Sequence, residues 1–265
     1  MREIRGQKRG RGRGINITIC GLKQMKNFTI IISTFNEEET IRECLDRVRA
    51  SAPEAEIILI HGGRDRTAEE ARDWGKERSD PIRVFNNYGD SGKAHAIKVG
   101  ITLASYPIML QFDADLQFAP EDIPRMIEPL MDGRADLVIG SRFMEGVDKS
   151  GYQSSFFRDK GNTFLNRYIS FLAGQSISDV TTGMKSWNKK AIWDIDFKDN
   201  RFVYEMEIVV RGALKGYRII QIPVIYLSRQ GGASGHGTGL TEFFSIIRTG
   251  FLIALRATMI RCNLW

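Results

Sequence analysis

Short apolar segments alternate with segments of helical periodicity up to residue 140, and this alternation constrains the fold most strongly. The apolar segments predict β-strands over 28–32, 56–60, 82–85, 108–112 and 136–140. The segments between them predict helices over 37–49, 67–74, 93–104 and 120–131. Strands and helices in this rhythm form βαβ units, so the sequence predicts an α/β fold with a mostly parallel sheet.

The rhythm changes after Ser141, and aromatic and basic residues become more frequent over 142–180. This part predicts helices over 162–172 and 203–214 and a strand over 218–226. An edge position is expected for the strand because it contains Pro223, which cannot donate a ladder hydrogen bond.

A chain of 265 residues, 42% of them hydrophobic, can bury a sizeable core in one large domain or two small ones. The net charge of +6 favours anionic partners such as phosphates, acidic lipids or nucleic acid. The excess charge is concentrated near the start of the chain, in Arg2, Arg5, Lys8, Arg9, Arg11 and Arg13. A solvated tail is the simplest interpretation, and contact with anionic lipid is the alternative. No aromatic residue interleaves the tail, so we expect no nucleic-acid partner.

A carboxylate pair follows the apolar segment that ends at Phe112. Asp113 and Asp115 are two residues apart, so at a strand end both side chains are expected to point to the same side. Most Asp-x-Asp pairs are solvated turn residues. Here, however, a strand precedes the pair, Gln117 follows it, and a helix start lies at Pro120. The segment therefore predicts a site for Mg²⁺ or Mn²⁺ shared with substrate phosphates, at the edge where α/β sheets bind ligands.

Two further loops are candidates for ligand contact. Residues 33–37 lie where the first strand meets its helix, and they could present a carboxylate and backbone donors to a nucleotide base. Taken alone, the segment favours an ordinary helix cap, with Asn36 at the N-cap and Glu39 in the capping-box position. Lys93 follows Gly92 at a helix start that could face a phosphate, although the full P-loop pattern is absent.

The C-terminal segment combines apolar and basic residues at helical spacing over 243–260, with no acidic residue after Glu242. No run of eighteen apolar residues occurs, so no full transmembrane span is expected. The segment predicts an amphipathic helix, and a position in the membrane interface is slightly favoured over packing on the domain.

Five motifs occur in an order that resembles the GT-A family of glycosyltransferases: 31–37, 92–93, 113–117, 140–142 and 178–183. The Asp-Ala-Asp-Leu-Gln core resembles the polyprenyl-phosphate sugar transferases. Segments 203–211, 222–224 and 229–234 are similar to those of the dolichyl-phosphate mannose synthases. The resemblance covers residues 28–237.

The resemblance implies a GT-A domain over 27–237, between a basic tail over 1–26 and a C-terminal membrane-interface helix over 238–265. It implies metal-assisted transfer of a sugar, with inversion, from a nucleotide-diphosphate sugar to a polyprenyl (dolichyl-type) phosphate at the cytoplasmic face of a membrane. GDP-mannose is the favoured donor. UDP-glucose as donor is an alternative, and so is a non-catalytic, membrane-associated scaffold. A separate membrane partner protein is a further candidate.

The resemblance also assigns site residues. It places the metal on Asp113, Asp115 and Gln117. It places the nucleotide sugar against Ser33, Phe35, Glu37, His61, Lys93, Asp113, Ala114, Asp115 and Arg229. It places the acceptor phosphate on Arg142, with Arg158 and Lys160 as additional cations. Asp113, Asp115 and Arg142 are the residues it implies for catalysis.

The chain departs from the family pattern at several positions. Ser33 stands where the family usually has proline, and His61 stands where it usually has an aspartate that contacts the nucleoside. Ser234 and Gly235 stand where a Ser-Lys pair is usual. A sugar-nucleotide pyrophosphorylase is a rival class, but it should carry a glycine-rich basic loop after the first strand, which residues 33–37 do not resemble.

Overall fold

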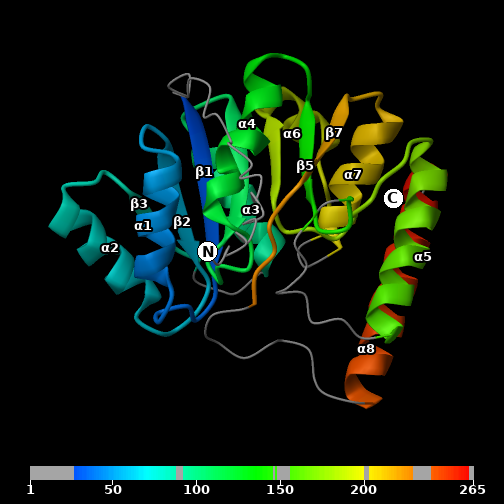
Figure 1. Ribbon diagram of the computed structural model, residues 1–265, viewed down its shortest axis with the longest axis horizontal. Helices are drawn as coiled ribbons and strands as arrows, with labels where there is room; N and C mark the ends of the chain where they lie inside the picture. Colours follow the sequence, from blue (N-terminus) through cyan, green and yellow to red (C-terminus); the bar gives the residue numbers. More distant parts are fainter. Residues whose placement is uncertain are drawn as a thin grey trace, which may run out of the picture.

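The computed structural model describes residues 27–87, 92–145, 147, 156–199, 203–228 and 240–262. Within these residues a seven-stranded sheet carries helices on both faces (Figure 1). The strands are β1 (Phe28–Thr34), β2 (Glu56–His61), β3 (Arg83–Asn86), β4 (Ile108–Asp113), β5 (Leu137–Ser141), β6 (Lys185–Asn188) and β7 (Ile219–Pro223). The helices are α1 (Ile41–Ser51), α2 (Thr67–Arg78), α3 (Lys93–Leu103), the 3₁₀ turn η1 (Pro120–Asp122), α4 (Ile123–Met131), α5 (Phe156–Ala173), α6 (Lys189–Ile195), α7 (Tyr204–Leu214) and α8 (Leu240–Arg261).

The strands lie in the order β3-β2-β1-β4-β6-β5-β7. The pairs β1–β2, β1–β4, β2–β3 and β5–β7 are parallel, whereas β6 runs antiparallel to both β4 and β5. The predicted mostly parallel α/β sheet is therefore confirmed. So is the edge position of the strand that contains Pro223.

Two apolar layers hold the helices to the sheet, because successive strand residues point to opposite faces. Phe28, Ile30 and Ile32 of β1 pack in the layer that includes α1, α2 and α4. Ile31 packs in the other layer, which includes α3, α6 and α7. Nearly all of these side chains are fully buried.

Helices α5 and α8 lie side by side at one end of the molecule, next to α7 (Figure 1). The Tyr168 hydroxyl of α5 and the Thr258 hydroxyl of α8 share a hydrogen bond of 2.6 Å. Ile253, Ala257 and Ile260 of α8 are buried in the same layer as α7. Of the described helices, none is long and apolar enough to cross a membrane.

The sequence analysis did not predict two elements and placed one boundary too late. Strand β6 and helix α6 were not expected, and α5 begins six residues before its predicted start at 162. Lys185 and Ser186 are buried in β6 despite their polarity, so the strand lacks the apolar signal by which strands are found. The predicted basic tail lies outside the described residues.

We expect Gly100→Val to destabilise the fold. Gly100 of α3 rests on Ile31 of β1, and an added Cβ would overlap the Ile31 side chain. Overpacking of this kind typically costs about 1–3 kcal/mol in the free energy of unfolding, measurable by denaturant titration. Thr102→Ala is the control, because Thr102 is exposed on the same helix and should stay within about 0.5 kcal/mol. Equal stabilities of the two variants would contradict the packing described.

Candidate active site

The site lies where the carboxyl ends of β1, β2 and β4 meet. Parallel pairing places Ser33 opposite Asp113 and Thr34 opposite His61. Three residues that the sequence analysis assigned to one site thus come from neighbouring strands of the sheet. Ligands bind at this edge in α/β folds, because the loops that follow the strands converge there.

Asp113 forms a partly buried ion pair with the first residue of α3. The Lys93 ammonium lies 2.8 Å from Asp113 Oδ2 and 3.0 Å from Glu205 Oε1. Burial opposes the charge on Lys93, but Asp113 and Glu205 outweigh it and raise the pKa of this lysine well above its usual range. Lys93 is therefore a permanent cation at the end of β4.

The backbone of Gly183 packs directly against the Lys93–Asp113 pair. A Cβ at Gly183 would collide with Asp113 Oδ2 and would lie 3.2 Å from the Lys93 nitrogen. The Gly183 carbonyl accepts a 2.5 Å hydrogen bond from the side-chain amide of Gln111, which lies on β4 two residues before Asp113. Only glycine allows the backbone to approach the pair so closely.

Asp115 lies in the turn beyond β4. Its Oδ1 accepts a 3.1 Å hydrogen bond from the backbone N–H of Gln117. Between them, Leu116 is fully buried and has a φ of 56°, a conformation that non-glycine residues rarely adopt and that often marks a functional turn. The negative charges of Asp115 and Asp113 both raise the pKa of the half-buried Tyr226.

These carboxylates fit a hard divalent cation. Among the described residues, no three His, Cys, Asp or Glu side chains form a group able to hold a metal alone. Mg²⁺ is commonly bound through only one or two protein carboxylates, with substrate phosphates completing its shell. Asp115 and the remaining oxygen of Asp113 are donors of that kind, so the predicted site agrees with the chemistry of the residues present.

Arg142, which follows β5, is held by a buried carboxylate. Its Nε and Nη2 donate to the two oxygens of Asp179 at 2.7 and 2.8 Å, and Nη2 also donates to Thr181 at 3.2 Å. The guanidinium lies over the Tyr226 ring at 5.2 Å and over Phe143 at 5.3 Å. Asp179 thus binds two N–H groups on one edge of the Arg142 guanidinium, the group to which the sequence analysis assigned the acceptor phosphate. A phosphate would have to meet the opposite edge of Arg142.

Tyr226 links Arg142 to the Asp113–Gln117 turn, and the sequence analysis did not single it out. It pairs with Phe118 in an isolated β-bridge, and the two rings meet edge to face at 5.0 Å. The next residue, Leu227, donates its N–H to the Gln117 carbonyl at 2.7 Å. Burial, reinforced by Asp115, raises the pKa of the Tyr226 hydroxyl. The hydroxyl is thus neutral at physiological pH, although Arg142 opposes the shift.

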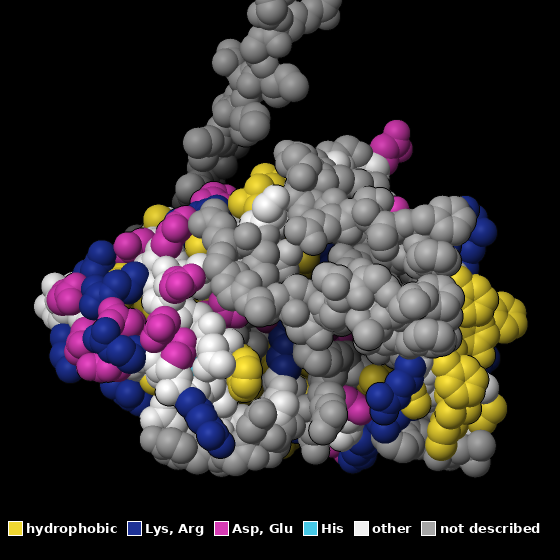
Figure 2. All heavy atoms as spheres, turned by 90° about the horizontal axis from the view of Figure 1, so that it is seen from below, with side chains coloured by type: hydrophobic (Ala, Val, Ile, Leu, Met, Phe, Trp, Pro, Cys, Tyr) yellow, Lys and Arg dark blue, Asp and Glu magenta, His cyan; other side chains and the backbone are white. Residues whose placement is uncertain are grey.

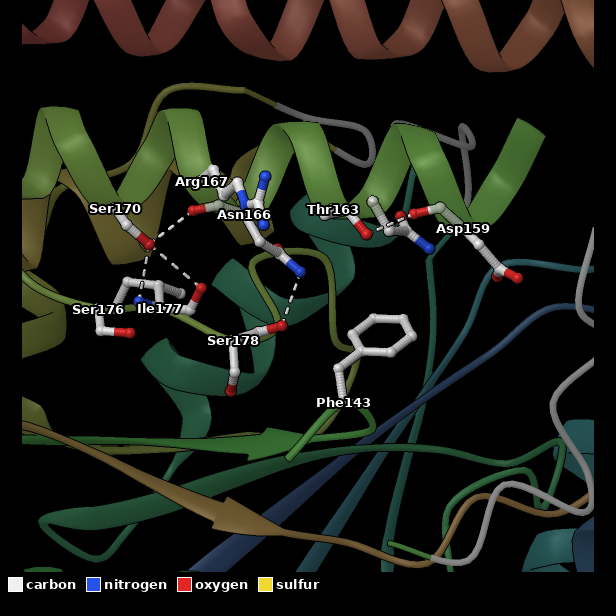
Figure 3. A pocket seen from close by; sticks show the side chains of 10 residues that line it. Phe143, Asp159, Thr163, Asn166, Arg167, Ser170, Ser176, Ile177 and Ser178 are labelled. Carbon is white, nitrogen blue, oxygen red and sulfur yellow. Dashed lines mark hydrogen bonds between the residues drawn. The ribbon is translucent and has the colours of Figure 1, made fainter. Parts of the chain in front are cut away.

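A cavity of about 710 Å³ lies between α5 and the chain that follows it (Figure 3). Asn166 spans it, donating to the Ser178 carbonyl at 2.6 Å and accepting from the Val180 N–H at 3.0 Å. The Ser170 hydroxyl accepts from the Ile177 N–H at 2.8 Å. These bonds hold residues 176–180, and with them Asp179, in place.

The three other predicted phosphate contacts are not placed at this cavity. Lys160 is exposed on α5 but does not line it, while the Arg158 side chain and Arg229 lie outside the described residues.

A second cavity, of about 470 Å³, lies beside the loop after β1 and contains the predicted Glu37. It is lined by Asn36, Glu37, Glu38, Glu39, Thr40, Arg64 and Asp65. Phe35, at 57% exposure, is available to contact a base. Asn36 is not the helix cap that local sequence favoured, because α1 begins at Ile41 after Thr40. With a φ of 56°, Asn36 instead accepts the Arg64 N–H at 3.0 Å and joins the turns after β1 and β2.

His61 is only 4% exposed and is not among the residues that line this cavity, so its predicted contact with the nucleotide sugar stays a prediction. Its Nδ1 shares a 3.1 Å hydrogen bond with the Thr34 hydroxyl. Its Nε2 has no hydrogen-bond partner among the described residues and lies 3.5 Å from Asp65. Burial lowers the pKa of His61, so the ring is neutral at physiological pH.

Glu205 and Glu207 of helix α7 have different roles. Glu205 contacts Lys93 at the site. Glu207 accepts 2.9 Å hydrogen bonds from the backbone N–H groups of Lys198 and Asp199 and pairs with Arg211 at 2.8 Å, so its role is structural.

The mostly parallel sheet, with an acidic turn after β4 and a polar loop after β1, defines a GT-A glycosyltransferase architecture. Residues 29–196 match the family model described as Glycosyl transferase family 2, and the chain belongs to that family.

Two curated relatives carry names of lipid-linked sugar enzymes. The dolichyl-phosphate hexose transferase of Haloferax volcanii is 29% identical over 206 residues, covering 77% of this chain and 85% of the relative. The polyprenol monophosphomannose synthase of Mycolicibacterium smegmatis is 26% identical over 212 residues, covering 77% and 79%.

Solved structures agree on the fold. Glucosyl-3-phosphoglycerate synthase from Mycobacterium tuberculosis, in complex with Mn²⁺, UDP and glucosyl-3-phosphoglycerate, has a TM-score of 0.65 at 16% identity. The similarity covers 91% of this chain and 81% of that one.

We expect Lys185 to make stability depend on pH. Lys185 is fully buried on β6 between Asp179 and Glu205, and burial lowers its pKa from 10.5 to about 8. Between those two pH values the unfolded chain binds a proton that the folded chain does not. The free energy of unfolding should therefore rise with pH, by at most about 1.4 kcal/mol per pH unit.

The measurement is denaturant unfolding of wild type and Lys185→Met from pH 7 to 10. The free energy of unfolding of wild type minus that of Lys185→Met should increase with pH, whatever its value at pH 7. Lys190→Met is the control, because Lys190 is exposed on the neighbouring helix. A difference that stays constant across this range would contradict the burial of a titrating lysine.

Proposed function

We propose that this glycosyltransferase moves a sugar from a nucleotide-diphosphate sugar to a polyprenyl phosphate, with inversion and with help from a divalent metal. The single observation that carries the proposal is that Tyr226 interacts with two groups of predicted site residues. On one side lies the acidic turn with Asp113 and Asp115, and on the other lies the Arg142 guanidinium. The names of the curated relatives support a lipid phosphate as acceptor.

The donor is proposed to bind across the ends of β1, β2 and β4. The base would enter the cavity beside Glu37, and Phe35 would offer it an exposed ring. Asp115 and Asp113, with Gln117, would hold Mg²⁺ or Mn²⁺, which neutralises negative charge on the diphosphate when bound. Lys93, kept protonated by Asp113 and Glu205, adds a fixed positive charge at the same place.

The reaction needs no strong base, because the acceptor phosphate is already ionised near neutral pH. A phosphate oxygen attacks the anomeric carbon, the bond to the diphosphate breaks, and the electron pair leaves with the nucleoside diphosphate. The protein's contribution is positioning and electrostatic stabilisation. Arg142, oriented by Asp179 and the Tyr226 ring, would present to the acceptor the edge of its guanidinium that faces away from Asp179. Arg158, Lys160 and Arg229 remain proposed phosphate contacts.

GDP-mannose is our favoured donor, because the motifs are similar to those of mannose-transferring relatives, and UDP-glucose is the alternative. We place the enzyme at the cytoplasmic face of a membrane, where a polyprenyl phosphate would be met. Whether a membrane partner protein assists is decided by assaying the chain alone. The full chain is incubated with labelled GDP-mannose or UDP-glucose and a polyprenyl phosphate in vesicles, and the lipid is then extracted and counted.

Asp115→Ala should lower transfer by at least about 10²-fold, the loss typical of removing one electrostatic stabiliser from an active site. Asp132→Ala is the control, because Asp132 is an exposed acid at the end of α4. Both variants should keep the thermal unfolding midpoint of wild type within a few degrees. Transfer that survives both Asp115→Ala and EDTA would overturn the metal role.

A non-catalytic scaffold is the remaining alternative, and nucleotide-sugar binding separates it from the enzyme. An enzyme should gain thermal stability with GDP-mannose or UDP-glucose, more so with Mn²⁺, and should then form labelled lipid. Binding without labelled lipid, in the presence of either donor, would favour the scaffold.

A further inference from the structure

Large apolar side chains lie exposed along one side of the α5–α8 pair. They are Phe164 and Phe171 of α5 and Phe251, Leu252 and Leu255 of α8, and we call them the α5–α8 face. Phe171 is 81% exposed and Phe251 is 66% exposed. In the space-filling view, hydrophobic side chains gather along the end of the molecule that these helices form (Figure 2). Apolar patches of this kind mark interaction sites on soluble domains.

The two helices present this face as one surface. The Tyr168–Thr258 hydrogen bond and the packing between α5 and α8 hold them side by side. On α5, Phe164 and Phe171 are seven residues apart, so they lie on one stripe. On α8, Ile253, Ala257 and Ile260 point into the protein, which leaves Phe251, Leu252 and Leu255 outside.

Part of the C-terminal helix thus packs on the domain, and its position in a membrane interface stays a prediction. About half of the apolar residues in the described part of α8 belong to the core, and α5 adds Phe164 and Phe171 to the exposed Phe251 of α8.

Over most of their length, helices α5 and α8 carry charge of a single sign, although Arg256 of α8 pairs with Asp199 of another segment. The sequence contains no Asp or Glu over 160–173 or over 248–262. Arg167, Arg248 and Arg261 are exposed on the same two helices, and Arg167 lies between Phe164 and Phe171. Aromatic and leucine side chains interspersed with arginine suit a bilayer interface, where rings enter the acyl boundary and guanidinium groups reach anionic headgroups.

We propose that the α5–α8 face is the surface by which this protein docks on an anionic lipid bilayer, with α5 contributing an essential half. The proposal rests on the proposed function in one respect, namely that the acceptor is a lipid phosphate. The opposite flank of α5 lines the 710 Å³ cavity beside Phe143, whose ring lies against Arg142 (Figure 3). Arg167 belongs to both surfaces, since it lines the cavity and is exposed beside Phe164 and Phe171. Docking through this face would therefore bring headgroups level with the approach to Arg142.

The test is flotation of the full chain with vesicles of phosphatidylcholine alone or with phosphatidylglycerol added. Wild type should float with the anionic vesicles, and Phe164→Ser combined with Phe171→Ser should lower the bound fraction at least about tenfold. Trp193→Ser is the matched control, because Trp193 is an aromatic residue 55% exposed on α6, away from this face. All variants should keep the unfolding midpoint of wild type and its stabilisation by GDP-mannose.

Equal flotation of the double variant and wild type would overturn the proposal, as would a wild-type chain that stays unbound on anionic vesicles. Light scattering measures the oligomeric state and so tests a second occupant of the face. If wild type is a dimer and the double variant is a monomer, the face binds another copy of this chain. Transfer to a short, water-soluble prenyl phosphate should be unchanged in the double variant. If wild type binds vesicles but labels no prenyl phosphate, the proposed function fails while the docking surface stands.

Discussion

Three cations and three carboxylates meet behind the ends of β4, β6 and β5, and the geometry of the site depends on their pairing. Lys93 lies between Asp113 and Glu205, Arg142 is clamped by Asp179, and the buried Lys185 interacts with both Glu205 and Asp179. Such charges are costly to bury, and removing one partner leaves an uncompensated charge that typically costs about 3–5 kcal/mol. The cluster therefore tolerates one arrangement of its members. The charge of Lys185 interacts with Glu205 on the donor side and with Asp179 on the acceptor side, so the two ion pairs are electrostatically coupled.

Strand β6 is the element that makes this cluster possible. It enters the sheet antiparallel between β4 and β5, and its own residue Lys185 pairs with Gln111 on one side and Ile139 on the other. The chain just before it supplies Asp179, Thr181 and Gly183, which touch Arg142 and the Asp113–Lys93 pair. One strand inserted against the direction of the others thus delivers the second half of the site to the ligand-binding edge.

Sequence reasoning found the features with local causes. The βαβ rhythm, the acidic turn after β4 and the edge strand with Pro223 each follow from periodicity or from one residue's chemistry. It missed β6, because buried Lys185 and Ser186 read as surface residues until their distant partners are known. It assigned Asn36 to a helix cap, because a capping pattern is local, whereas the Arg64 N–H that Asn36 actually accepts lies 28 residues away. Tyr226 escaped notice and Asp179, although part of the 178–183 motif, received no role for the same reason, since their partners come from other loops.

Helix α5 performs separate tasks on three flanks, which explains its mixed sequence. One flank packs Leu165 and Ile169 into the core and meets α8 through Tyr168. A second carries Asn166 and Ser170, which hold the loop bearing Asp179 and so orient Arg142. The third exposes Phe164 and Phe171. Because a helix is stiff over a few turns, a force applied to the outer flank is carried to the loop that positions Arg142. A bilayer against α5 would thus act on the acceptor side of the site, whereas the donor side rests on β1, β2 and β4, which α5 does not join.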